Sequence, residues 1–466
     1  MRIYPRGMVR TTTFAASLAL AVLLAPACGG DDSSGTGANG TGASGTGASG
    51  TGADGTGANG TGANGTGGDG TGATGAGGDG TGGVEACIGS SVLATLGEDH
   101  LLVGVSTSDA VAASAPFDVR YLYLAGAIAD GAGPCASCAS GCTAQGQSCS
   151  NAAGCGWWGC WQYDQDPPGA YVRNLVATAS GDGQIPMITY YLVLQASGAN
   201  EGEPEVDAIN DAAFLGRYLA DFRFMLQQIG SAKAIVHVEP DFWGYAEHKN
   251  PDPHATPAPA PAANATDCAN EEASIAGLGR CMIAMSHKYA PNAVIGLHGS
   301  GWGTKMDVLQ NEDPAFDVAG EAAKLGNFLH ECGPAADLVV VDAADRDAEY
   351  YQSIGNDTWW DDTNAALPSF HQAFAWSKAL SETMNKPHLW WQIPVGNMSL
   401  PGGNDHWKDN RVDYFFAHWD EVAAAHGVGA AFGAGMGGMT TPETDGGNLV
   451  AKTQAYSAAG GQKLCP

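Results

Sequence analysis

The chain has 466 residues, with 49 Asp and Glu against 20 Lys and Arg, which gives a formal charge of −29. So acidic a chain is a poor partner for nucleic acid or anionic lipid, because both select basic protein surfaces. The charge balance instead favours a neutral or cationic ligand.

The first 27 residues have the layout of a secretion signal. Three Arg come without any acid, an apolar stretch covers about 14–24, and small residues precede Cys28. The apolar stretch is too short to remain as a membrane-spanning helix. The segment resembles a lipobox, in which cleavage leaves Cys28 as the acylated N-terminus. An ordinary signal cleaved near Ala27 is the alternative.

A flexible tether is expected over residues 28–83, where Gly-Thr-Gly-Ala repeats dominate and apolar side chains are almost absent. Such a segment buries too little surface to offset the entropy of ordering it. Without residues 1–27 the chain carries 17 basic and 49 acidic residues, a charge of −32. We therefore expect an exported domain over 84–466, either lipid-anchored to a membrane or cell surface or secreted. The lipid anchor is the one membrane contact expected.

Cysteine usage agrees with export. Apart from the anchor cysteine there are eleven, and six of them lie within 135–160. Two of these six are spaced as Cys-x-x-Cys, which can hold zinc, but an oxidising compartment favours disulfides. Cys268 with Cys281, and Cys87 with Cys465, are plausible pairs, and the odd count leaves one thiol over.

Short apolar runs alternate with helical patterns along the domain. The runs typical of buried strands are 101–105, 119–124, 187–194, 234–238, 293–297, 337–341, 388–393 and 428–432. Apolar residues at helical spacing between them predict helices over 214–229, 314–329, 369–384 and 410–425.

This alternation predicts the fold class. Repeated strand–helix units form a parallel sheet, and eight units indicate an α/β fold that closes into a (β/α)8 TIM-like barrel. A distorted seven-stranded barrel or an open sheet is the alternative, because the first run is weak. The Cys-rich segment would be a loop insertion between the second strand and its helix.

The fourth run ends in the most informative residues. Alternation along the strand sends Val236 and Val238 outward, so His237, Glu239 and Asp241 should point inward or into the barrel mouth. A buried strand end offers two acids no structural role, and their mutual repulsion would raise one carboxyl pKa. Glu239 and Asp241 are therefore candidate catalytic acids.

The later strand ends add polar and aromatic side chains at the same rim. Asp342 ends the sixth run and is a further catalytic candidate. Flat aromatic faces beside polar groups suit sugars, whose C–H faces stack on rings while their hydroxyls form hydrogen bonds. The candidate substrate-binding residues are Tyr191, Trp243, His298, Trp302, Trp390, Gln392 and His406.

One motif resembles a known family. The segment V-H-V-E-P-D at 236–241 is similar to a strand motif of glycoside hydrolase family 6, the inverting cellulases on a distorted α/β barrel. The resemblance implies that Asp241 is the general acid and that Asp405, after L-P-G-G-N, is the base. The family's acidic segment after an earlier strand has no counterpart near Gln195, and Leu400 replaces its Lys.

The predicted function is hydrolysis of a glycosidic bond in an extracellular polysaccharide or oligosaccharide, with no cofactor. Asp241 or Glu239 would protonate the leaving oxygen, and Asp342 or Asp405 would activate water or attack the sugar. Acids on strands four and six favour Asp342, whereas the family resemblance favours Asp405 and implies a β-glucan such as cellulose.

Two other functions fit the same residues. A non-catalytic carbohydrate-binding surface lipoprotein would keep the cleft and its aromatic side chains, and an Asp241 buried in an ion pair would favour it. A metal-dependent hydrolase using His237, Glu239, Asp241 and His298 ranks lower, because no HxH or HExxH spacing is present.

Overall fold

The computed structural model describes residues 87–125, 128, 142–144, 147–149, 161–163, 168–403 and 405–464. The expected signal, the acylated Cys28 and the tether lie outside the described residues. So do the side chains of the six clustered cysteines. Those expectations therefore stay predictions.

Eight parallel strands form a closed barrel, as the alternation of runs predicts. In order around the barrel they are β1 (Leu102–Val105), β2 (Val119–Ala125), β5 (Ile185–Tyr191), β6 (Ala234–Val238), β7 (Ala293–Gly299), β8 (Leu338–Asp342), β9 (His388–Ile393) and β10 (Gly427–Phe432). The seven-stranded and open-sheet alternatives are wrong. A separate antiparallel pair, β3 (Cys142–Ala144) with β4 (Gln147–Cys149), belongs to the insertion after β2.

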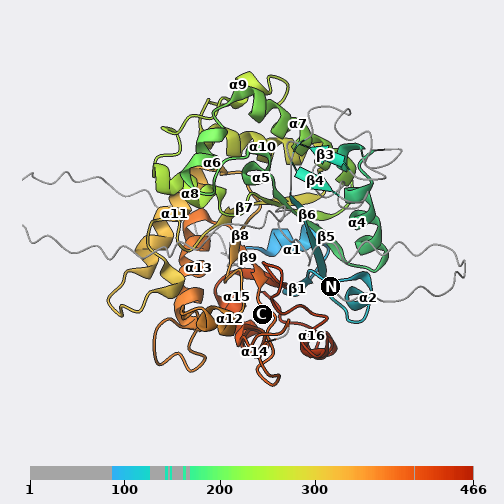
Figure 1. Ribbon diagram of the computed structural model, residues 1–466, viewed down its shortest axis with the longest axis vertical. Coiled ribbons are helices and arrows are strands. Elements are labelled where there is room, and N and C mark those ends of the chain that lie inside the picture. Colours follow the sequence, from blue (N-terminus) through green and yellow to red (C-terminus); the bar gives the residue numbers. More distant parts are fainter. Residues whose placement is uncertain are drawn as a thin grey trace, which may run out of the picture. The chain divides into compact units, whose positions relative to one another are not determined.

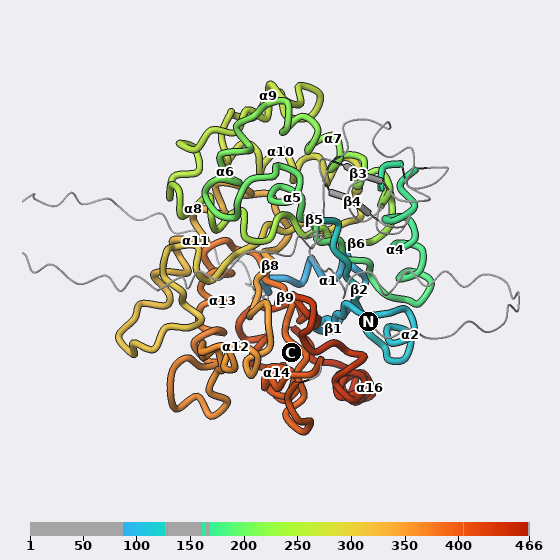
Figure 2. The backbone as a smooth tube through the Cα atoms, viewed as in Figure 1, coloured from blue at the N-terminus to red at the C-terminus, as the bar shows by residue number. Residues whose placement is uncertain are grey.

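The barrel closes where the first and last strands meet. Leu102 pairs with Gly429 in the β1–β10 register, and Figure 2 shows the blue start of the barrel beside its red end. A Cβ atom at Gly429 would collide with the carbonyl oxygen of Leu102. Closure at this point therefore requires the missing side chain of glycine.

Helices surround the strands in Figure 1, covering the outer face of the barrel. They are α1 (Ser90–Leu96), α2 (Asp109–Ala112), η3 (Trp161–Tyr163), α4 (Ala170–Gly181), α5 (Val193–Ser197), α6 (Glu203–Ala208), α7 (Ala212–Ile229), α8 (Phe242–Lys249), α9 (Ala260–Ala263), α10 (Ile275–Tyr289), η4 (Val308–Gln310), α11 (Val318–Cys332), α12 (Ala348–Ser353), α13 (Phe370–Met384), α14 (Arg411–Ala417), α15 (Trp419–Ala424) and α16 (Asn448–Ala458). The inner face of each strand packs in the barrel interior and its outer face packs against helices. β6, β7 and β9 are therefore buried along their whole length.

Three of the four predicted helices are confirmed as α7, α11 and α13. The side chain of Asp211 accepts hydrogen bonds from the amides of Ala213 and Phe214 and so starts α7. The fourth, expected over 410–425, is divided at His418 into α14 and α15. The third strand ends at Tyr191, and the residues beyond it form α5.

The cysteines in the described part agree with the predicted pattern. Cys268 and Cys281 form a disulfide, and Cys332 is a buried free thiol whose pKa is raised by burial. Cys87 is also disulfide-bonded, but Cys465 lies outside the described residues.

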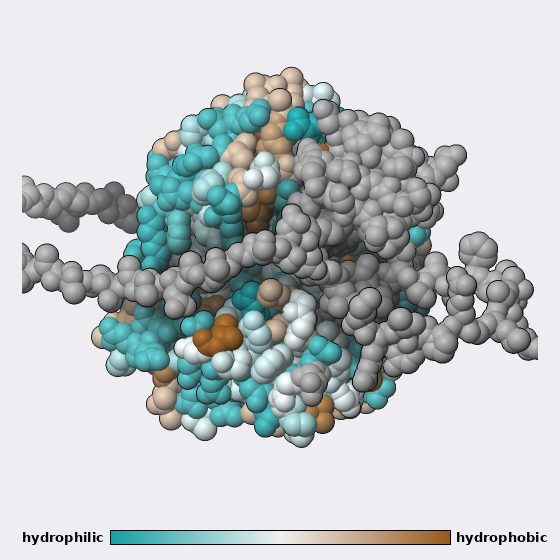
Figure 3. All heavy atoms as spheres, viewed as in Figure 1, coloured by the Kyte–Doolittle hydropathy of each residue, from teal (hydrophilic) through white to brown (hydrophobic). Residues whose placement is uncertain are grey.

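The described helices do not meet the requirements of a membrane-spanning helix. None of them combines the length and the apolar character that crossing a bilayer requires. On the face shown in Figure 3 the coloured surface is mostly hydrophilic, in keeping with the acidic composition.

Candidate active site

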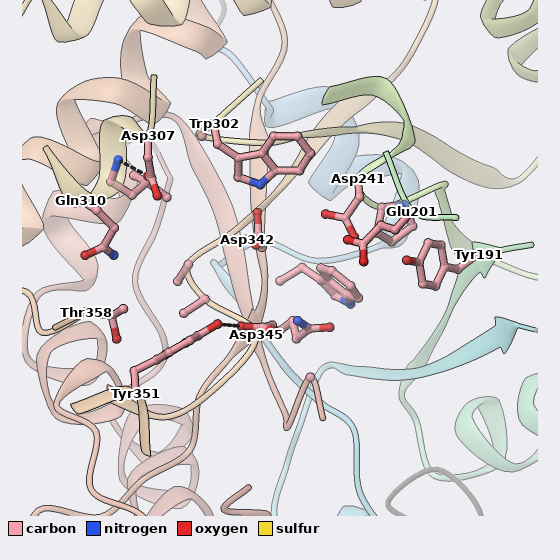
Figure 4. Close-up of a pocket in the computed structure, with 18 of the residues that line it drawn as sticks. Tyr191, Glu201, Asp241, Trp302, Asp307, Gln310, Asp342, Asp345, Tyr351 and Thr358 are labelled. Atoms are coloured by element: carbon pink, nitrogen blue, oxygen red, sulfur yellow. Dashed lines mark hydrogen bonds between the residues drawn. The ribbon is translucent and has the colours of Figure 1, made fainter. Parts of the chain in front are cut away.

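A cavity of about 450 Å³ opens at the carboxyl ends of the barrel strands. Its walls come from the ends of several strands and from the loops that follow them (Figure 4). The lining residues are Tyr123, Tyr191, Glu201, Pro240, Asp241, Tyr245, Gly301, Trp302, Asp307, Leu309, Gln310, Asp342, Ala343, Ala344, Asp345, Tyr351, Thr358, Trp391, Gln392 and Gly435. This is the end at which (β/α)8 barrels build their active sites.

Asp241 lines the cavity just beyond the end of β6. Its backbone φ of 68° lies in the left-handed region, which is uncommon for a residue with a side chain. Burial raises its pKa to about 7, an effect opposed by His298 and reinforced by the nearby charges of Asp342 and Glu201. Within the described part of the chain it has no ion-pair partner, so it can carry a proton near neutral pH.

Glu239 does not reach the cavity. It is 1% exposed, and its Oε1 accepts hydrogen bonds from the backbone amides of Leu192, at 3.0 Å, and Val193, at 3.2 Å. Burial raises its pKa to about 8. The carboxyl group thus ties the end of β6 to the start of α5, and the expectation that it has no structural role is wrong.

Asp342 ends β8 and faces the cavity above a chain of buried polar side chains. Nε2 of His298 lies 3.3 Å from Oδ1 of Asp342, and Nδ1 of His298 lies 3.1 Å from Nε2 of His237. Nδ1 of His237 in turn lies 3.2 Å from Oγ1 of Thr189. Burial, together with His298, lowers the pKa of His237 well below its usual value, so His237 is neutral.

The two adjacent tryptophans of β9 face opposite ways. Trp391 lines the cavity and packs edge-on against His237, with ring centroids 4.6 Å apart. Trp390 is fully buried outside the barrel, where it packs against Phe374 and Phe415 of the surrounding helices. The prediction that Trp390 binds substrate is therefore not supported by its position, whereas its neighbour Trp391 lines the cavity.

Three of the predicted substrate-binding residues lie in the cavity wall. Trp302 packs against Tyr245 with ring centroids 4.6 Å apart, and Tyr191 stands beside Asp241 in Figure 4. Gln392 also lines the wall, where its amide oxygen accepts a hydrogen bond from the hydroxyl of Tyr123.

Four predicted site residues lie elsewhere. Trp243 is buried in the core, and its indole N–H donates a hydrogen bond to the carbonyl oxygen of Val238. His298 is buried beneath the cavity. His406 accepts a hydrogen bond from the amide of Asn397 and so stabilises its own loop. Asp405 is exposed and is not among the lining residues.

Sequence reasoning missed several lining residues. Glu201 precedes α6, Asp307 precedes η4, and Thr358 follows α12. They lie in loops without periodic patterning, so no spacing could place them at the cavity. Asp345 also lines the cavity, where it forms an ion pair with Arg346 at 2.9 Å.

Of the four side chains of the metal-dependent alternative, His237 and His298 contact each other, but no three bring ligating atoms together. Among the described residues, only Glu98, His100 and Asp118 bring three metal-ligating atoms within 4.8 Å of one another. These three precede β1 and β2, at the opposite end of the barrel from the cavity. The side chain of Glu239 is occupied by backbone amides instead.

Comparison with known proteins finds similarity only among solved structures. No protein-family profile matches the chain, and no curated protein matches it. The endoglucanase Cel6 from Mycobacterium tuberculosis is 15% identical, with a TM-score of 0.25, over 51% of this chain and 60% of the endoglucanase. The chain thus spans less than two thirds of that protein.

Two further structures cover more of the chain. A modular endo-β-1,4-mannanase of glycoside hydrolase family 26 from Cellulomonas fimi is 12% identical over 79% of this chain and 73% of its own, with a TM-score of 0.43. A glycoside hydrolase family 5 mannosidase from Rhizomucor miehei is 10% identical over 75% of this chain and 85% of the mannosidase, with a TM-score of 0.39. At these values the similarity assigns no activity to the chain.

Proposed function

We propose that the protein is a glycoside hydrolase whose two working carboxyl groups are Asp241 and Asp342. The observation that carries the proposal is a cavity in which a carboxyl group with a pKa near 7 shares space with a second acid and with aromatic faces. A group with that pKa is suited to donate a proton at neutral pH.

In this mechanism protonated Asp241 donates its proton to the glycosidic oxygen as the bond from that oxygen to the anomeric carbon breaks. Asp342, as a carboxylate, supplies the second function: it removes a proton from an attacking water, or it attacks the anomeric carbon and is released by water. The separation of the two carboxyl groups selects between these outcomes. In both, one water is consumed: when Asp342 acts as base, its gained proton and the proton lost by Asp241 are exchanged through solvent, and when Asp342 attacks, Asp241 regains its proton from the water that releases the sugar.

The second acid is Asp342 rather than Asp405 in this proposal. The resemblance to glycoside hydrolase family 6 nominates Asp405, but that residue is exposed and outside the cavity wall. Asp342 lies in the wall beside His298, which can hold its carboxyl group in place. Acids from the fourth and sixth barrel strands therefore form the pair.

Hydrolysis by the full chain, assayed against neutral, acidic and amino polysaccharides, tests the proposal. We expect new reducing ends from wild type and from the matched control Asp182→Asn, which changes an exposed acid next to α4, but none from Asp241→Asn. Undiminished release by Asp241→Asn would refute the assignment. Binding without release by any form would favour a carbohydrate-binding protein instead.

We also propose that the enzyme works outside the cell. The support is the sequence of residues 1–83 alone, which has the layout of a secretion signal ending before Cys28, followed by Gly-rich repeats expected to form a tether. A tethered hydrolase could reach polymers too large to enter a cell. Labelling with a radioactive fatty acid, compared between wild type and Cys28→Ser, tests the anchor.

A further inference from the structure

The cavity is strongly acidic. Five of its lining residues carry carboxyl groups: Glu201, Asp241, Asp307, Asp342 and Asp345. The described lining residues include no Lys, Arg or His. A concave surface lined by one charge sign concentrates ligands of the opposite charge.

Two basic side chains lie beside these acids: His298, whose Nε2 lies 3.3 Å from Oδ1 of Asp342, and Arg346. Arg346 pairs with Asp345 at 2.9 Å and packs over Tyr351.

Among the described residues, Glu201 and Asp307 accept hydrogen bonds from neutral donors only: the hydroxyl of Tyr245 at 2.8 Å and the backbone amide of Leu309 at 3.1 Å. These two carboxyl groups therefore keep their capacity to bind a cation.

In sequence, the undescribed residues beyond the expected signal, which itself carries three Arg, are poor in basic residues. The segment 126–167, which follows β2, contains no Lys or Arg in its sequence, and it contains three more Asp. Residues 28–86 contain no Lys or Arg either.

The acids are spread along the cavity. In Figure 4 Asp307 lies on one side of Asp342, near Gln310 and Thr358, whereas Glu201 lies on the other side, near Tyr191. Charge on both sides of the proposed reaction centre suits a chain that carries repeated positive groups rather than a single small cation.

The cavity also has features that favour a positively charged sugar over cations without sugar rings. Trp391 is 2% exposed, and its Nε1–H has no hydrogen-bond partner among the described residues although the ring lines the cavity. A buried donor without a partner is costly and is satisfied by a ligand acceptor such as a hydroxyl. Trp302 adds an aromatic face on which the C–H face of a sugar ring can stack.

From these observations, and resting on the proposed hydrolase function, we propose that the substrate is a polysaccharide of amino sugars with free, protonated amines. Asp307 and Glu201 bind ammonium groups of sugars on either side of the cleaved bond, while the aromatic rings hold the sugar faces. Asp241 and Asp342 remain the reacting groups.

Binding to the inactive full-length variant Asp241→Asn tests the substrate class without requiring hydrolysis. Isothermal titration at pH 5.5 and low salt would use four probes: β-1,4-linked glucosamine hexamer, its N-acetylated form, cellohexaose and hexalysine. We expect the amino hexamer to bind about tenfold tighter than the acetylated and neutral hexamers, with the difference shrinking as salt is added. Asp342→Asn replaces Asp241→Asn if the latter does not fold.

A second substitution locates the effect. Adding Asp307→Asn should weaken binding of the amino hexamer by about fivefold and leave cellohexaose within about twofold. The matched control is Glu312→Gln, which removes one exposed acid from the same loop outside the cavity wall and should change neither affinity.

Three results would overturn the inference: equal or tighter binding of cellohexaose, binding of hexalysine as tight as that of the amino hexamer, or no binding of the amino hexamer. The first would leave the hydrolase proposal intact with a neutral substrate. The second would indicate unspecific attraction of cations.

Discussion

Nε2 of His298 lies 3.3 Å from Oδ1 of Asp342, and the same imidazole lies 3.1 Å from the neutral ring of His237. The contact joins the cavity to the buried interior of the barrel. His298 is 1% exposed, so we expect it to position the carboxyl group of Asp342 rather than to touch substrate.

Replacing His298 with Gln should lower kcat by about 10- to 100-fold and change KM little, because misplacing a reacting group raises the barrier more than it weakens binding. The same substitution removes a group that lowers the pKa of Asp241. The alkaline limb of the kcat/KM profile should therefore move to higher pH. A lower kcat with an unmoved limb would indicate a purely structural role.

Asp241 should make both activity and stability depend on pH. Activity should fall as pH rises through about 7, because the general acid then loses its proton. Since burial raises the folded-state pKa above the ordinary 3.8, the folded protein binds the proton more tightly. Stability from this group is thus fully present below about pH 4 and lost as pH rises to about 7.

The same pH dependence predicts how removing the Asp241 charge affects stability. At pH 8 Asp241→Asn should be more stable than wild type by on the order of 2 kcal/mol, because it carries no buried charge, and the difference should vanish near pH 4. Thermal unfolding at the two pH values measures it. A variant less stable than wild type at pH 8 would contradict the burial of Asp241.

Glu239→Ala should destabilise the fold by about 1–3 kcal/mol, because the amides of Leu192 and Val193 lose their acceptor. Glu239→Gln, which keeps a carbonyl oxygen, should cost less. Urea unfolding of both variants gives the comparison. If both cost equally, the carboxyl group must act through its charge.

Asp409→Ala should be among the most damaging single changes in the barrel. Asp409 and Arg411 are both fully buried and pair at 2.6 Å, so removing the acid leaves an uncompensated buried guanidinium and should cost about 3–5 kcal/mol. Replacing both residues together, as Asp409→Leu with Arg411→Met, should cost less. Urea denaturation tests whether the double variant is the more stable one.

Much of the fold follows from the sequence because its strands are buried runs separated by helical periodicity. The errors at the site have a local cause. The alternation that assigned Glu239 to the cavity applies only inside a strand, but β6 ends at Val238. Glu239 then adopts a φ of 48°, which turns its side chain out of the alternating pattern. Strand parity does separate Trp391 from Trp390, because both lie within β9.

The positions of loop residues relative to the cavity could not be predicted from the sequence, for a different reason. Asp405 was nominated from a short motif, and a motif in a loop carries no information about where the loop folds. Glu201 and Asp307 have no periodic neighbours, so only the closed barrel shows that their loops meet at one rim.

The distribution of the cavity wall over separate loops has a consequence for the evolution and redesign of the protein. Asp307 follows β7 and Glu201 follows β5, so each flanking charge belongs to a different exposed connection. Loops tolerate substitution better than the strands that support them. Exchanging one loop acid for a lysine would redirect one end of the cleft toward acidic glycans while Asp241 and Asp342 stayed in place, so ligand preference and bond cleavage are separately adjustable in this barrel.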